Sequence, residues 1–270
     1  MQQIAATKPI QVLAIAVATL GAALAAGLAV SSGVAGGANT KAEIIGPVTD
    51  RAKSSCPGKD CSAFGHVTGY QMRTANQTGV HKVRSDGHVV AWSVDLGTIG
   101  DEATLEFFET NLEDATFDRY GGSPVANLAV LKDKGKGKFK LAKQSPIVEL
   151  ENHLGGKPIF TLRKPLKVKK GQILALSTPT WVLNFAEDRT NGKSLGADNK
   201  WRASRRASRC EAEDLNDNGK IEGPKEIRNL TSRSKPQVKK GDTRRYGCVY
   251  TAAQILYWGY MVPDKTDEEA

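Results

Sequence analysis

The chain has 270 residues, with 38 lysines and arginines against 29 acidic residues, so its formal charge at pH 7 is +9. This positive charge favours anionic partners such as wall polymers, acidic polysaccharide, nucleic acid or lipid headgroups, although a solvated basic surface without a ligand is the alternative. Beyond residue 38 the chain keeps about 230 residues, which argues against two domains and for one.

The N-terminus has the layout of a bacterial secretory signal. Lys8 is the only charged residue before an apolar run from Val12 to Val30, and small residues from Ala35 to Ala38 offer cleavage points. We therefore predict a signal peptide over 1–38 and a protein that is secreted or associated with the cell wall. The run is also long enough to cross a bilayer, so an uncleaved membrane anchor is the alternative.

Four cysteines follow this segment, in the part of the chain that export would place where disulfides persist. Cys56 and Cys61 flank a Pro-Gly turn, which predicts a local bridge and leaves Cys210 to pair with Cys248. A zinc site is the alternative, but the spacing lacks a CxxC pair.

Residues 39–86 are polar and rich in glycine, serine and threonine, which predicts an irregular lead-in with one strand near 64–72. Regular order is expected from Gly87, and 88–96 should form the first long strand because alternate apolar residues share one face. The pattern over 103–112 is typical of either a strand or a short helix.

Residues 123–132 and 139–150 are predicted to form a hairpin with a flexible lysine and glycine tip over 133–138. Residues 158–186 then alternate at a period of two, with a glycine turn at 168–172, which predicts a half-buried antiparallel sheet. One face of its strands should carry Phe160, Leu162, Leu166, Val168, Leu174, Leu176, Trp181, Leu183 and Phe185.

A polar loop insertion is predicted over 187–242 because this segment has few large apolar residues. Lysine and proline recur at 164–171 and 235–241, and we interpret both as edge strands that lead into interior ones. The second interior strand should be 246–262, and an acidic disordered tail should follow over 263–270.

The absence of alternating helices indicates an all-β fold, a two-sheet antiparallel β-sandwich that is jelly-roll-like and carries long polar loops. The segments VVAWSVDLG, FTLRKPLKVKKGQILAL, WRASRRASRC and RYGCVY resemble those of secreted bacterial β-sandwich proteins with no assigned activity. The resemblance covers Gly87 to Val262. It implies a sandwich like that of lectins or carbohydrate-binding modules and transfers no catalytic residue.

One segment resembles the first nine positions of an EF-hand or dockerin calcium loop, with glycine at position 6 and an aliphatic residue at position 8. Position 12 should be a bidentate carboxylate, but Lys225 stands there, so a polar turn is the alternative. The candidate calcium residues are Asp214, Asn216, Asn218, Lys220 and Glu222. No other cofactor is expected.

Basic residues cluster over 132–140, 202–209 and 233–245, and they would form one surface if these loops share an end of the sandwich. Other aromatic residues are expected in the core, whereas Trp201 has polar and charged neighbours. The candidate ligand-binding residues are therefore Trp201, Arg202, Arg205 and Arg206, with solvated charge as the alternative.

No motif of an enzyme is present: the histidines are scattered, and no serine elbow, HExxH or opposed acidic pair accompanies them. We predict a binding module for a carbohydrate or an anionic wall polymer, in preference to a nucleic acid partner. A membrane would be a partner only if the N-terminal segment stays uncleaved. The alternatives are a structural envelope protein or a hydrolase that acts on polysaccharide.

Overall fold

The computed structural model describes residues 42–47, 53–57, 63–75, 77–102, 105–106, 122–186, 198–207, 210, 235–251 and 253–264. Contacts between Cα atoms divide the chain into Met1–Gly37 and Ala38–Ala270, and every described residue belongs to the second unit. The predicted signal segment lies outside the described residues. Within them, no helix has the length and apolar character that crossing a membrane requires.

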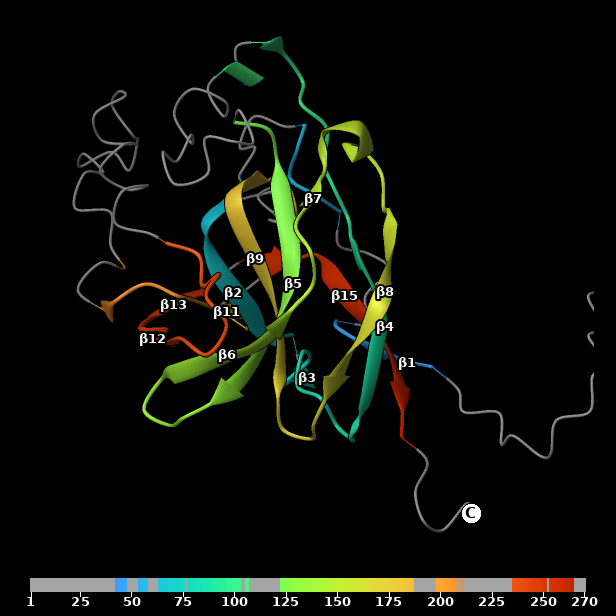
Figure 1. Cartoon of the computed structure of the whole chain (residues 1–270). Coiled ribbons are helices and arrows are strands. Elements are labelled where there is room, and N and C mark those ends of the chain that lie inside the picture. Colours follow the sequence, from blue (N-terminus) through green and yellow to red (C-terminus); the bar gives the residue numbers. More distant parts are fainter. Residues whose placement is uncertain are drawn as a thin grey trace, which may run out of the picture. The chain divides into compact units, whose positions relative to one another are not determined.

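Two antiparallel sheets account for most of the described residues, which confirms the predicted all-β sandwich (Figure 1). The small sheet has the strand order β1 (Glu43–Ile45), β15 (Tyr257–Pro263), β4 (Gly87–Val94), β8 (Ile159–Val168). The large sheet has the order β12 (Thr243–Arg245), β6 (Lys138–Gln144), β5 (Val125–Asp133), β9 (Ile173–Val182), β2 (Phe64–Thr74), β11 (Lys200–Ala203), β13 (Cys248–Thr251).

Short strands complete the described sheets. β3 (Gln77–Thr78) pairs with β2, and β7 (Val148–Glu149) pairs with β5. β10 (Phe185–Ala186) and β14 (Gln254–Ile255) pair with each other in a separate small ladder. A 3-10 turn, η2 (Glu151–His153), follows β7.

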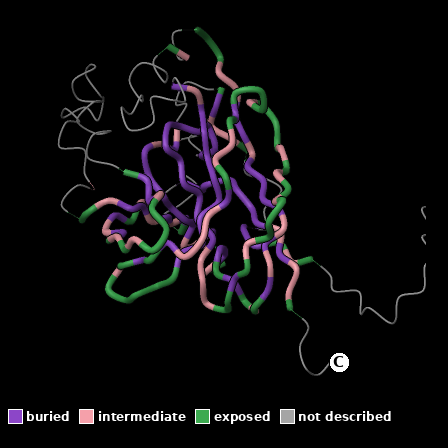
Figure 2. The backbone as a smooth tube through the Cα atoms, viewed as in Figure 1, coloured by how far each residue is buried: buried purple, intermediate pink, exposed green. Residues whose placement is uncertain are grey.

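The main core lies between the two sheets, where the buried residues of Figure 2 gather. β5 shows how the alternation of a strand divides its side chains: Leu128 and Val130 join the main core, whereas Ala129 and Leu131 belong to a second cluster. Each large apolar side chain buried in this way stabilises the fold by about 1.5 to 3 kcal/mol.

The second cluster covers the opposite face of the large sheet and explains why β9 is buried on both faces. Phe139, Leu141 and Tyr246 pack there with Tyr70 and Ala175 of the neighbouring strands. The predicted half-buried pattern is therefore wrong for β9, because the main core covers one of its faces and the second cluster covers the other.

The segment that covers this face is held by a buried amide, Gln237. Its Nε2 donates to the carbonyl oxygens of Phe139 (3.1 Å) and Asp242 (2.7 Å), and its Oε1 accepts from the hydroxyl of Tyr246 at 2.7 Å. Residues 235–242 thus form a loop anchored by side chains, so the edge strand predicted over 235–241 is wrong.

The predicted glycine turn connects β8 to β9 and is confirmed. Gly171 has φ +85°, which suits glycine because it carries no Cβ, and Gln172 N–H donates to Lys169 O at 3.0 Å. However, β8 belongs to the small sheet and β9 to the large one. The turn therefore carries the chain from one sheet to the other, and Trp181 and Leu183 pack in a separate cluster instead of with Phe160.

Three boundaries differ from the sequence predictions. The strand predicted in the lead-in is present as β2, but it is central in the large sheet, so the sandwich begins before Gly87. β11 lies inside the predicted loop insertion. The strand predicted over 246–262 is divided into β13, β14 and β15, because β13 serves the large sheet and β15 the small one.

The predicted bridge between Cys210 and Cys248 is confirmed, with their Cα atoms 5.0 Å apart. It ties β13 to the segment that follows β11. Cys56 is also disulfide-bonded, whereas Cys61, its predicted partner, lies outside the described residues. These bonds are consistent with an oxidising, extracellular location.

Candidate functional site

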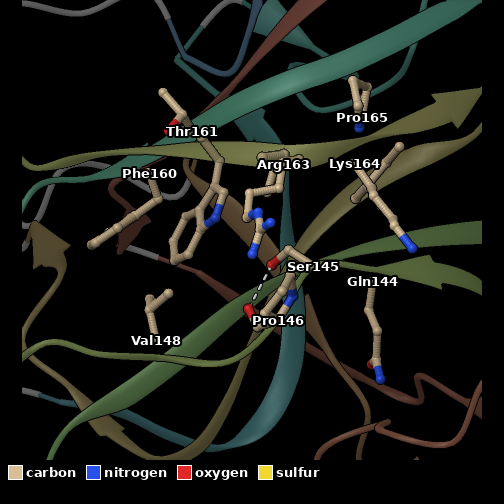
Figure 3. Close-up of a pocket in the computed structure, with 12 residues that line it drawn as sticks. Gln144, Ser145, Pro146, Val148, Phe160, Thr161, Arg163, Lys164 and Pro165 are labelled. Carbon is tan, nitrogen blue, oxygen red and sulfur yellow. Dashed lines mark hydrogen bonds between the residues drawn. The ribbon is translucent and has the colours of Figure 1, made fainter.

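A groove of about 950 Å³ opens between β8 of the small sheet and the segment that runs from the end of β6 to β7 (Figure 3). Most of its surface is apolar. The lining residues are Trp92, Gln144, Ser145, Pro146, Val148, Phe160, Thr161, Leu162, Arg163, Lys164, Pro165 and Leu166.

A bulge in β8 forms one wall of the groove. Thr161 pairs with Ala91 and Leu166 pairs with Val89, so four residues of β8, 162–165, stand opposite the single residue Val90. Bulges bend a strand and redirect its side chains. Figure 3 shows the consequence, because the Arg163 side chain reaches from β8 toward Ser145 and Pro146 instead of pointing away from the groove.

Two aromatic rings form the apolar part of the groove. Trp92 of β4 is fully buried and lies directly opposite Phe160 in the ladder, with their ring centroids 4.8 Å apart. Phe160 is half-buried and exposes part of its ring. The indole Nε1 of Trp92 is buried and has no hydrogen-bond partner among the described residues. Buried donors normally have a partner, so this indole is an exception within the described part of the chain.

The opposite wall is rigid because its backbone groups are already paired. Ser145 Oγ accepts from Leu128 N–H at 3.0 Å and donates to Pro146 O at 2.9 Å. Ser145 N–H donates to Leu128 O at 2.8 Å. The groove is therefore held in shape by the large sheet itself.

The charge of the groove is purely positive. Arg163 and Lys164 are both exposed and are the only charged residues in its described lining. No carboxylate lines it, so its described walls do not offer the two opposed acids that glycoside hydrolysis needs.

A second feature, here called the basic strip, consists of Lys132, Lys138, Lys140 and Arg245. Lys132 opposes Lys140 across β5 and β6, and Lys138 opposes Arg245 across β6 and β12. All four are exposed. The pairing of β12 with β6 thus brings two of the predicted basic clusters, 132–140 and 233–245, together.

The strip lies on the face of the large sheet that elsewhere meets the core. On β5, Lys132 continues the alternation of Leu128 and Val130, and directly opposite residues share its face. The four side chains of the strip are exposed, so this part of the face is open to solvent. Figure 1 shows the hairpin of β5 and β6 that carries them. The strip and the groove therefore lie on the same face of the large sheet.

Like charges directly opposite each other destabilise a sheet, and the strip contains two such pairs. No described residue forms an ion pair or hydrogen bond with these four side chains, although the neighbouring Arg244 pairs with Asp242 at 3.0 Å. Asp133, beside them, accepts from the backbone N–H of Gly135 at 2.7 Å. The positive charge of the strip is therefore uncompensated within the described residues.

The structure does not join the predicted ligand residues into one site. Trp201 is only 8% exposed and packs in the main core, stacked on Tyr250 at 4.4 Å, so the expectation that it differs from the other aromatic residues is wrong. The physical reason is the alternation of β11, which directs Trp201 to the core and Arg202 to the other face.

The arginines beside Trp201 are partly engaged. Arg205 Nη1 donates to Tyr250 Oη at 2.9 Å. Burial raises the pKa of Tyr70 to about 12, and the adjacent Arg202 opposes this rise. Arg206 is exposed. Arg202 and Arg205 therefore interact with tyrosines, and buried Trp201 offers no exposed ring beside them.

The predicted calcium residues, Asp214 to Glu222, lie outside the described residues. Within the described part of the chain, no group of three or more His, Cys, Asp or Glu side chains is placed to hold a metal ion. His81 and His88, close in sequence, are separated in space: His81 is buried against Tyr257, and His88 Nδ1 lies 3.1 Å from Asp264 Oδ1 at the surface.

No protein-family model, curated protein or solved structure matches this chain. The resemblance to secreted bacterial sandwich proteins therefore stays a prediction.

Sequence reasoning missed the groove because its walls come from two sheets. The proline and lysines of 164–167 did mark β8 as an edge strand, and that prediction is confirmed. Only the tertiary structure shows that this edge and residues 145–148 form the two walls of one groove.

Proposed function

We propose that this chain is an exported binding module that holds an anionic polymer of the cell envelope on the basic strip. The observation that carries the proposal is the pair of like-charge contacts, Lys132 with Lys140 and Lys138 with Arg245, which face each other directly without a described counter-charge. Anionic groups placed between these side chains would convert two repulsive pairs into attractive ones.

A polymer suits the strip better than a single small anion. The four cations span three adjacent strands about 4.8 Å apart and two positions about 7 Å apart along β6. Repeated phosphates or carboxylates of one chain can occupy such a grid together. The exposed lysines of the hairpin tip, Lys134 and Lys136, would extend the same contact.

Charge is favoured over sugar stacking as the basis of recognition. The large aromatic side chains that could stack on sugar rings are mostly in the core: Trp181 and Tyr257 are fully buried, and Trp201 and Trp258 are nearly so. A neutral glycan would find few exposed rings on the described surface, whereas an acidic polysaccharide or polyol phosphate would find the strip.

The test is a binding titration with inorganic polyphosphate and with isolated cell wall at several salt concentrations. The double variant Lys132→Gln/Lys140→Gln should bind at least tenfold more weakly. If both lysines contact the polymer, the slope of log K against log salt should fall in magnitude by about 1.4.

The matched control is Lys169→Gln/Lys170→Gln, which removes the same charge from exposed positions in the turn after β8. It should keep most of the affinity. Equal losses in both double variants would mean that net charge alone attracts the polymer, and the proposal would be withdrawn.

A further inference from the structure

We infer that the groove beside β8 is a separate binding site for a single acyl chain that ends in an anionic head group. Its volume, about 950 Å³, lies near the upper end of the range of about 300 to 1,000 Å³ that is usual for small-molecule sites. Its walls offer apolar side chains over most of their surface, from Trp92, Phe160, Leu162, Leu166 and Val148.

The head group is assigned from the charges and donors of the groove. Arg163 and Lys164 supply positive charge and no described lining residue supplies a carboxylate, so a carboxylate or phosphate is the complementary head. The Nε1 of Trp92 is buried, so it plays no part in this assignment. A wholly apolar ligand would leave both cations unused.

A partner strand is a poorer occupant of this site. β8 is an edge strand, but Pro165 has no N–H to donate and the bulge over 162–165 breaks the regular ladder that an added strand would need. The exposed lysines at 164 and 167 also disfavour the addition of another strand to this edge.

A second copy of the chain is also disfavoured. In a two-fold dimer the same patch meets itself, so Arg163 and Lys164 of one protomer would approach the same cations of its partner. An amphiphile with an acidic head removes this repulsion, whereas self-association adds to it.

The assignment of an acyl chain to the groove is tested by calorimetry with octanoate, decanoate and dodecanoate, each below the concentration at which it forms micelles. Affinity should rise by up to about fourfold for each methylene that the groove buries. Leu162→Glu should abolish binding. Leu162→Ala, a milder change at a half-buried position, should weaken dodecanoate at least fivefold and keeps the test valid if the glutamate variant does not fold.

The head-group assignment is tested with Arg163→Gln, a change at an exposed side chain, and with dodecanol as the uncharged analogue. Arg163→Gln should lower the affinity for dodecanoate about tenfold and leave the affinity for dodecanol unchanged. Lys167→Gln, the control on the same strand, should change neither affinity. Wild-type protein should prefer dodecanoate to dodecanol by a similar factor.

Three results would overturn the inference: no saturable binding of dodecanoate, equal affinity for dodecanol, or occupation of the groove by a peptide strand or a second copy in a cross-linking experiment. The outcome is independent of the strip, because Lys132→Gln/Lys140→Gln should bind dodecanoate as the wild type does. Loss of polyphosphate binding with retained dodecanoate binding would separate the two sites.

Discussion

Acidification should destabilise this protein through one buried histidine. His81 is 1% exposed, and its ring stacks on that of Tyr257 with centroids 4.0 Å apart. Its Nε2 lies 3.1 Å from the carbonyl oxygen of Tyr257, which can only accept, so Nε2 carries the proton of the neutral ring. Burial, opposed in part by backbone hydrogen bonds, lowers the pKa of His81 from 6.5 to about 4.

The direction and the size of this loss of stability follow from the linkage between proton binding and folding. Between pH 6.5 and 4 the unfolded chain binds a proton at this histidine and the folded chain does not, so the free energy of unfolding falls as the pH falls. With these two pKa values, His81 should remove about 2 kcal/mol between pH 7 and pH 5, and about 3 kcal/mol by pH 4.

The measurement is urea unfolding at pH 7 and pH 5, followed by tryptophan fluorescence, for the wild type and for His81→Phe. Phenylalanine keeps a flat ring against Tyr257 but cannot titrate. The variant is expected to be less stable at pH 7, because the Tyr257 carbonyl loses its donor, yet to lose about 2 kcal/mol less than the wild type on going to pH 5.

Acidic side chains contribute equally to both proteins, so the difference between the two losses isolates His81. His81→Gln provides a second non-titrating variant in case the phenylalanine packs poorly. If the wild type and both variants lose the same stability between pH 7 and pH 5, the reasoning from burial is refuted.

Other predictions concern the supports of the fold. Replacing Cys210 and Cys248 by serine should cost about 4 kcal/mol in thermal or urea unfolding, because the bridge closes a sequence separation of 38 residues; reduction of the wild type, which also breaks the disulfide of Cys56, should cost at least as much. Gln237→Leu should cost about 3 kcal/mol in urea unfolding, since two carbonyls and the Tyr246 hydroxyl lose their partner, whereas a loss below 1 kcal/mol would contradict the network. Trp201→Ala should cost about 4 kcal/mol, yet any protein that remains folded should keep its affinity for polyphosphate, and a selective loss of that affinity would restore Trp201 as a ligand residue.

The sequence predicted the local elements well where one physical signal dominated. The alternation over 158–168, with proline and lysines, indicated an edge strand, and β8 is one. The glycine of the following turn and the bridge between Cys210 and Cys248 were also predictable, since each depends on the properties of a few residues.

The candidate site was less predictable because its residues come together only through strand order. The pair of Lys138 with Arg245 arises only when 243–245 joins the edge of the hairpin, and no pattern within 233–245 indicates that partner. Trp201 illustrates the opposite error. Its charged neighbours suggested a surface site, but a strand alternates, so basic residues beside a tryptophan are compatible with a buried indole.

By itself, the sequence determined which segments of this protein favour strands and turns, since these preferences depend on neighbouring residues. Only the tertiary structure decided that β8 and β9 lie in different sheets, that β9 is covered on both faces, and that an apolar groove stays open beside β8. The reason is that burial of a strand depends on which distant segments cover it, and the local period of side chains carries no record of that choice.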